Sequence, residues 1–509
     1  MGAARGVLMS SSPQPNNTPA AANTLQVLRD RYGERYRWYL LLAVMVGAMA
    51  AIMSSTIVNV AIPDMSQHFA LGQARAQWVS SGFMAAMTVS MLTTPWLLDR
   101  YGYRAVYGGA VLLLLAGGVG GGFSDFFWGV LTARLAEGLA AGVLQPIPAI
   151  IVLRAFAPHE QGRASGLFGM GVVLAPALGP SLGGVLVDLF GWRSIFFMVV
   201  PLCLASLWLA WKFVPSSAPG GALPNRHGGA LDWRGLLVAS TGTLCLLNGL
   251  VYLHGGNAAV AAALLVAAAL AITGFIVWQK YLARTGRQPL MNLSLFQSPN
   301  FALGSMVALI YGAALFGSTY LLPVLMQRGL LLSASLAGAI LLPAGMVLAV
   351  TVALVGRLAD RKPAYQLVST GLVLLALSFA LMPWVGLQTG LWLLAALAVV
   401  GRVGLGFILP SLNLGSMRGL ESGLISQGAS VINFVRTLGG AAGVSLCGIV
   451  LEWRLDARGD TFALAASSPG RLAAFGDTFL MLAALCALAT LAAWRIRPPA
   501  GHTTSLPPP

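Results

Sequence analysis

Acidic and basic side chains inside long apolar segments are the residues of this chain that could do chemistry. Most acids fall at the ends of these segments, but Glu137 lies well inside one, three residues after Arg134. Residues three apart project from nearly the same face of a helix. Burial in lipid favours the neutral form of a carboxylate, and a neighbouring arginine favours the ionised form. The pair is therefore predicted to couple proton movement, with Glu137 carrying the proton and Arg134 modulating it. A purely structural ion pair is the alternative.

The composition indicates the class of protein whose helices must position this pair. The 509 residues are 57% hydrophobic and only 9% charged, whereas a soluble domain carries about 25% charged residues. The chain is therefore predicted to be an all-α polytopic membrane protein. Its net charge of +15 could suggest nucleic acid as a partner, but lysine and arginine sit mainly in short loops between apolar runs. This distribution indicates positively charged cytoplasmic loops, so no nucleic-acid partner is expected.

About 20 apolar residues cross a bilayer, and this rule gives roughly fourteen spans. Loop arginines fall on one side of such a topology, which places both termini in the cytoplasm. A weak internal repeat suggests two related halves. Asp99-Arg100 after the second span is matched by Asp360-Arg361, and Arg134 in the fourth span by Arg402 in the twelfth. The predicted plan has a disordered tail at 1–36, a six-helix bundle at 37–213, a linker with two further helices at 214–288, a second six-helix bundle at 289–497 and a tail at 498–509.

Glycine and proline recur at fixed offsets between Gly166 and Gly184. Small residues allow two membrane helices to approach closely, and proline is tolerated there because neighbouring groups satisfy the freed carbonyls. We therefore expect a closely packed helix at the contact between the two halves. The spacing resembles the antiporter signature of the major facilitator superfamily, which falls here on Gly166, Ala175, Gly179, Pro180, Gly183 and Gly184.

The loop after the second span resembles the cytoplasmic gate motif of the same superfamily. The matching residues are Leu97, Asp99, Arg100, Gly102 and Arg104, with Pro95 in place of a glycine. The second copy keeps Gly356, Leu358, Ala359, Asp360 and Arg361. A carboxylate at a helix end, paired with cations on neighbouring helices, can latch one conformation and release in another. Asp99, Arg100, Asp360 and Arg361 are the predicted gate residues.

The first span resembles the signature of the fourteen-span drug:proton antiporters, the EmrB/QacA type. Thr56, Asn59 and Pro63 match that signature, but Ser54 stands where the family has an aspartate. An acid inside a membrane is a natural proton carrier, and this one is missing. The stretch from Arg134 to Gly142 resembles the family's fourth-span motif, with Glu137 in a glutamine position. Glu137 is therefore the candidate that replaces the missing acid.

The resemblance implies a major facilitator fold with fourteen helices, in two six-helix bundles plus two inserted ones. It implies multidrug efflux by proton antiport and alternating access, in a bacterial inner membrane. The implied partners are hydrophobic small molecules, protons and lipid, and the resemblance allows a periplasmic adaptor and an outer-membrane channel. No cofactor, metal or catalytic residue is expected, and no phosphate-binding G-x-x-x-x-G-K-[ST] loop is present to couple ATP.

Two other functions remain open at this stage: transport of one specific metabolite, and a non-transporting sensor or partner protein on a transporter fold. An intramembrane serine hydrolase is disfavoured, because Ser416 lacks the G-x-S-x-G turn. For a transporter, polar, aromatic and methionine side chains of the spans are candidates for a substrate cavity. They are Ser54, Asn59, Met84, Phe168, Tyr311, Tyr320 and Asn433.

Overall fold

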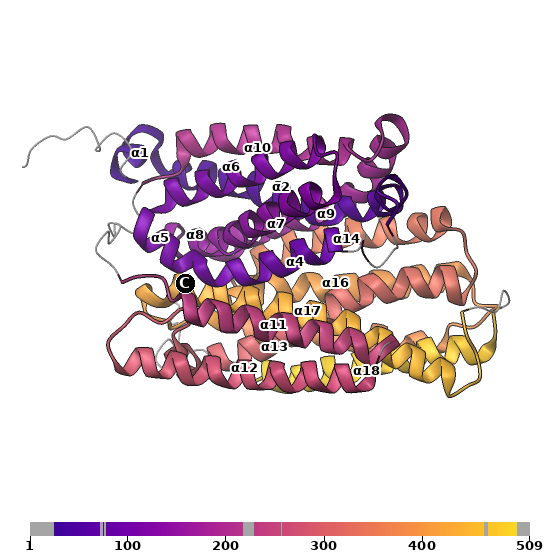
Figure 1. Ribbon diagram of the computed structural model, residues 1–509. Coiled ribbons are helices and arrows are strands. Elements are labelled where there is room, and N and C mark those ends of the chain that lie inside the picture. The colour runs from indigo at the N-terminus through magenta and orange to yellow at the C-terminus, as the bar shows by residue number, and fades with distance from the viewer. Residues whose placement is uncertain are drawn as a thin grey trace, which may run out of the picture.

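The computed structural model describes residues 25–71, 75, 78–216, 229–255, 257–462 and 467–495. Its regular elements within those ranges are helices. The first group, at the top of Figure 1, comprises α1 (Leu25–Tyr32), α2 (Tyr36–His68), α4 (Trp78–Ser90), α5 (Thr94–Tyr101), α6 (Tyr103–Gly122), α7 (Phe127–Leu144), α8 (Ile147–Ala155), α9 (Gln161–Phe190) and α10 (Ser194–Phe213).

A helical pair and a second group follow. The pair is α11 (Trp233–Gly255) and α12 (Ala258–Arg284), drawn in front of the lower group in Figure 1. The second group comprises α13 (Pro299–Val324), α14 (Ala334–Ala359), α15 (Ala364–Leu381), α16 (Leu391–Met417), α17 (Ile425–Asp456) and α18 (Pro469–Ala493).

Twelve segments of the described chain are helical, long and apolar enough to cross a membrane. The predicted count of fourteen is therefore not supported. The two predicted spans outside the twelve are 78–101 and 161–190. In the first, the 3₁₀ turn η3 (Met91–Thr93) separates α4 from α5. The second is α9, in which the side chains at positions 177, 178, 180 and 181 lie outside the described residues.

Each group has its own packing. In the first, α2 packs on α9 and α10, and α7 packs between α4 and α6. In the second, α13 packs on α17 and α18, and α15 packs on α16. The two groups meet chiefly where α9 lies along α14, in the middle of Figure 1. The helices α11 and α12 pack on each other, and α11 also contacts α4 and α17.

The predicted tails are only partly described. Residues 1–24 and 496–509 lie outside the described ranges. Within the predicted tail 1–36, however, residues 25–32 form α1, whose Leu28 is buried. The Tyr32 ring contacts that of Phe213 at the end of α10, with the centroids 5.4 Å apart. Apolar and aromatic contacts with α10 thus give this part of the predicted tail a fixed position.

One polar cluster fixes the α11–α12 pair. The carboxylate of Asp232, just before α11, accepts hydrogen bonds from the Gly235 amide at 2.8 Å and from Trp278 Nε1 at 2.9 Å. Its second oxygen accepts from Nε2 of the fully buried Gln279 at 2.7 Å. Because Trp278 and Gln279 belong to α12, Asp232 joins the start of one helix to the last turns of the other.

Candidate functional site

The side chains of Arg134 and Glu137 form a buried ion pair on α7. Arg134 Nη1 lies 2.5 Å from Glu137 Oε2, and each side chain is 1% exposed. The predicted three-residue spacing thus brings both groups to one helix face. A desolvated pair of this kind is stabilising only when further hydrogen bonds satisfy its remaining polar atoms.

Ser54 of α2 completes the cluster. Its hydroxyl donates to Glu137 Oε2 at 3.2 Å and accepts from Arg134 Nη1 at 2.8 Å. Arg134 also donates to the backbone carbonyls of Ser54 and Val79, each at 3.2 Å. The guanidinium lies over the Phe83 ring of α4, 4.2 Å from its centroid. Side chains from α2, α4 and α7 thus meet at the position where the resembling family carries its acid.

Glycines make room for the pair. A Cβ added at Gly117 of α6 would lie 2.5 Å from Glu137 Cγ. One added at Gly138 would meet the backbone carbonyl of Phe83. Glu137 Oε1 and Arg134 Nη2 are buried without a hydrogen-bond partner among the described residues. A buried polar atom left unpaired is unfavourable, so the carboxyl keeps one oxygen that could exchange a proton if the site opened.

The predicted gate residues make different contacts in the two copies of the gate motif. Asp360 accepts from the backbone amides of Gly162 at 2.6 Å and Arg163 at 2.9 Å, at the start of α9. An anion is favoured there because free amides and the helix dipole point at it. Burial is the largest influence on the Asp360 carboxyl and raises its pKa, while the two amide bonds act in the opposite direction.

In the first copy, Asp99 is exposed and interacts electrostatically with Arg154. Arg154 in turn donates to the carbonyl of Ser422 in the second group at 2.9 Å. Arg104 donates to the Trp211 carbonyl, and Arg361 is exposed. Pro95 is the second residue of α5, where its missing N–H costs no helical hydrogen bond. This explains how proline replaces the family glycine.

We call the region holding Asp99, Arg154, Arg163, Asp360 and Ser422 the gate end of the molecule. The contacts above place these residues together, so Arg163 and Arg361 lie at the same end. Since α9 begins and α14 finishes at the gate end, Phe190 and Ala334 mark the opposite end, which we call the far end.

The glycines of α9 serve two different contacts. A Cβ at Gly166 would lie 2.7 Å from the Cα of Gly356, so α9 and α14 touch backbone to backbone near the gate end. Towards the far end, a Cβ at Gly179 would lie 2.8 Å from Thr56 Oγ1, and one at Gly183 would lie 2.6 Å from Ile57 Cγ1. Both of those neighbours belong to α2. The expectation that the whole stretch packs between the halves therefore holds only for its first part.

Three residues of the antiporter signature remain, namely Ala175, Pro180 and Gly184. Ala175 is buried and packs near Ile52 and Met53 of α2. Gly184 would place a Cβ in open space. The side chain of Pro180 lies outside the described residues. Backbone contact between the groups therefore rests on the first glycine of the signature rather than on the last.

The candidate cavity residues do not form one wall. Ser54 belongs to the ion-pair cluster, Asn59 is exposed and accepts from Ser80 Oγ at 3.0 Å, and Met84 is half-buried. Phe168 borders a small gap between α8, α9 and α16, whose volume of about 10 Å³ suits one water. In the second group Tyr311 and Asn433 are buried and Tyr320 is 38% exposed.

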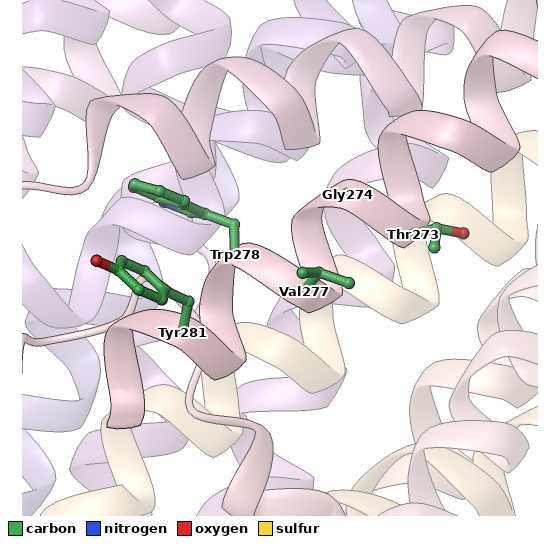
Figure 2. A pocket seen from close by; sticks show the side chains of 5 residues that line it. All are labelled: Thr273, Gly274, Val277, Trp278 and Tyr281. Carbon is green, nitrogen blue, oxygen red and sulfur yellow. The ribbon is translucent and has the colours of Figure 1, made fainter. Parts of the chain in front are cut away.

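An apolar hollow lies elsewhere, on α12. Figure 2 shows Thr273, Gly274, Val277, Trp278 and Tyr281 around a space of about 430 Å³. All five come from α12, and Val277 and Tyr281 are more than half exposed. The Trp278 and Tyr281 rings stack with centroids 5.7 Å apart. A hollow on one face of one helix is a surface groove, and such aromatic side chains near a span end are typical of the membrane interface.

Sequence reasoning missed a second buried ion pair, between Asp460 and Arg471. Arg471 Nη2 lies 3.0 Å from Asp460 Oδ1, and both residues are buried. Arg471 also donates to the carbonyls of Thr461 at 2.6 Å and Arg328 at 3.1 Å. A hydrogen bond from Ser468, together with the hydrogen bond and positive charge of Arg471, holds the pKa of the Asp460 carboxyl below its usual value. The pair fixes the α17–α18 connection to the end of α13, and its residues carry no distinctive spacing that could have revealed it.

Two groups of helices meet along α9 and α14, and a charged pair is buried inside one of them. Such an arrangement is typical of membrane transporters. The profile of the Major Facilitator Superfamily matches residues 44–444, and the chain belongs to this superfamily. Family and fold together identify a transporter rather than an enzyme.

Relatives and a solved structure agree with this assignment. The Multidrug resistance protein B homolog of Mycobacterium tuberculosis is 28% identical over 434 residues, 84% of this chain and 78% of the relative. The Multidrug export protein EmrB of Haemophilus influenzae is 26% identical over 415 residues, 80% of this chain and 79% of the relative. The proton:xylose symporter XylE matches with a TM-score of 0.64 at 13% identity, covering 91% of this chain and 96% of that one, and shares the fold.

Proposed function

We propose that this transporter exports hydrophobic and amphipathic compounds in exchange for protons. The similarity to proteins named for multidrug resistance and multidrug export supports the direction and the substrate class. In this proposal α4–α5 and α9 also cross the bilayer, which gives fourteen spans of the EmrB/QacA type. The gate end and both termini face the cytoplasm of a bacterial cell, and a periplasmic adaptor and an outer-membrane channel are candidate partners.

The contact between Glu137 and Ser54 carries the proposal of proton coupling. The resembling antiporters place an acid at the position of Ser54, and here the carboxylate of Glu137 reaches that position from α7. The proton-carrying group would thus be supplied by a different helix at the same point in space. Arg134, bonded to both side chains, would favour the ionised form of Glu137 and so help it to release its proton.

Alternating access would use the contact at the gate end. There Asp360 accepts a hydrogen bond at the start of α9 and Gly166 approaches Gly356, and these contacts would hold the closed state. Release of these contacts would let the two groups rock apart at the gate end and open the site to the side of the membrane that the gate end faces.

The test uses purified protein in liposomes and export of a fluorescent cationic dye driven by a pH gradient. Glu137→Gln keeps the shape and polarity of the side chain but cannot ionise. We expect it to bind dye as the wild type does and to lose gradient-driven export to the level of protein-free liposomes. Glu421→Gln, at an exposed position outside the helices, is the matched control and should export normally.

Other results would point elsewhere. Normal gradient-driven export by Glu137→Gln removes the proton-coupling assignment. Dye movement that ignores collapse of the gradient in the wild type favours uncoupled movement or a specific metabolite as substrate. The absence of any flux favours a sensor or partner protein built on a transporter fold.

A further inference from the structure

Two arginines of the second group lie deep within membrane-length helices. Arg402 is in the middle of α16, and Arg436 is more than ten residues from either end of α17. A residue ten positions from a helix end lies about 15 Å from that end, roughly half the thickness of the hydrocarbon core. Charged side chains at this depth are unfavourable and mark functional sites by default.

Neither arginine has a carboxylate partner among the described residues. Arg402 reaches the Thr319 hydroxyl with both terminal nitrogens, at 3.3 and 3.4 Å. Arg436 donates to Asn433 Oδ1 at 2.6 Å. These partners are neutral, and Asn433 in turn donates its own amide to the Ala429 carbonyl. The two positive charges are therefore not neutralised by the protein.

The first group offers a direct comparison. Arg134, the counterpart of Arg402 in the internal repeat, has Glu137 three residues later and is 1% exposed. Three residues after Arg402 stands Leu405, which is buried and apolar. Arg402 and Arg436 are instead partly exposed. One half of the transporter closes over a neutralised pair, while the other leaves two guanidinium groups accessible.

Both arginines lie beside α13, Arg402 where that helix carries Thr319 and Arg436 where it carries Gly312. The backbones of α13 and α17 touch there, since a Cβ at Gly312 would meet the carbonyl of Arg436. Thr319, the partner of Arg402, lies on the exposed part of the same helix. Arg402, Arg436 and Thr319 thus form a positively charged, partly exposed region along α13.

We propose that this region binds the anionic group of the transported compound, so that the substrates include amphipathic organic acids. A guanidinium presents a planar fork of donors that matches a carboxylate or sulfonate. The inference rests on the proposed export function and adds the charge of its substrate.

The phosphate of an anionic lipid has the same chemistry, so the test must separate the two sources. Binding of 2-naphthoate is compared with that of its neutral isostere 2-naphthamide, by calorimetry on the purified full chain in a neutral detergent. The titration is repeated with added phosphatidylcholine and with added phosphatidylglycerol. Since no gradient is applied, the result does not depend on proton coupling.

We expect 2-naphthoate to bind at least about 10-fold more tightly than 2-naphthamide. Arg402→Gln and Arg436→Gln should each remove most of this preference without changing the affinity for the amide. Leu405→Glu keeps both arginines but recreates the spacing of Arg134 and Glu137, so it should neutralise Arg402 and weaken 2-naphthoate binding in the same way. Arg357→Gln removes one charge at an exposed site and should leave both affinities unchanged.

Equal binding of acid and amide by the wild type, or an unchanged preference in all three site variants, overturns the inference. A 10-fold loss of 2-naphthoate affinity with phosphatidylglycerol but not phosphatidylcholine assigns the region to a lipid headgroup and overturns it as well. Either result leaves the proposed export function standing if pH-driven dye export still requires Glu137. Conversely, normal export by Glu137→Gln would remove the proposed coupling and leave a measured acid preference intact.

Discussion

At the scale of single residues, the proposed proton coupling depends on which helix supplies one carboxylate. Glu137 on α7 and the hydroxyl of Ser54 on α2 lie 3.2 Å apart, and Arg134 bonds to both. An aspartate at position 54 would therefore reach the same guanidinium. The two positions are then alternatives for one proton site, and this idea can be tested without reference to the substrate.

The double variant Ser54→Asp/Glu137→Gln should recover gradient-driven export that Glu137→Gln alone has lost. The new carboxylate would contact Arg134 and would sit beside a neutral glutamine, so no second charge is buried. We expect recovery to between about a hundredth and about a tenth of the wild-type rate, because misplacing a reacting group by about 1 Å can lower a rate by about 100-fold. The measurement is initial dye efflux from proteoliposomes after a pH jump.

The single variant Ser54→Asp provides the control. It buries two carboxylates next to one arginine, and like charges in one site oppose each other's ionisation. We expect slower export than in the wild type at neutral pH. If the double variant is as inactive as Glu137→Gln while remaining folded, the two positions are not interchangeable and the proton site is not shared between α2 and α7.

The sequence allowed Glu137 to be selected because it is the acid farthest from any span end, and an acid in lipid requires a reason. The same reasoning could not reveal its contact with Ser54, which depends on how α2 and α7 pack. Asp232 and the pair of Asp460 and Arg471 lie close to span ends, where charges are ordinary. Nothing in their spacing distinguishes these anchors from solvated loop residues.

At the scale of elements, α9 joins two kinds of packing in one helix. Its first turns lie against α14 of the other group, while Gly179 and Gly183 lie against α2 of its own group. Small-residue spacing predicts that a helix is closely packed but does not say against which neighbour. This is why the signature predicted one inter-group contact along the whole stretch and the structure contains two different contacts.

Gly166→Ala should weaken closure of the gate end, whereas Gly184→Ala on the same helix should have no effect. The added methyl at position 166 would lie 2.7 Å from the Cα of Gly356, while the one at 184 meets nothing within 4 Å. Overpacking of this kind destabilises an interface by about 1–3 kcal/mol. Accessibility of a cysteine at the exposed Arg361 to a membrane-impermeant reagent measures gate opening. Equal labelling in the two glycine variants would contradict the assignment of Gly166 to the inter-group contact.

At the scale of the whole molecule, composition was sufficient to predict a helical membrane protein, and the motifs were sufficient to predict its superfamily. The number of spans differed, fourteen predicted against twelve candidates in the described residues, at 78–101, where η3 separates α4 from α5, and at α9. The conformation could not be predicted from the sequence, because the proposed alternating access requires at least two. In the structure, Asp360 and Gly166 make contacts between the two groups at the gate end.

Closure at one end should be linked to opening at the other. Because α9 and α14 run in opposite directions past each other, spin labels at Arg163 and Arg361 report on the gate end, and labels at Leu189 and Leu336 report on the far end. All four positions are exposed. If the two groups rock as rigid bodies, any change of pH that lengthens the first distance should shorten the second, and Glu137→Gln should abolish the pH response of both. Distances between the paired labels, measured by pulsed electron resonance in liposomes, give the sign of each change.

Distances that lengthen together would indicate loosening of the whole interface, and a far-end distance that stays constant while the gate opens would indicate a local gate without rocking. Either pattern would rule out a rigid-body motion that opens one end while closing the other. Asp360 and Gly166 would then affect contacts at the gate end only.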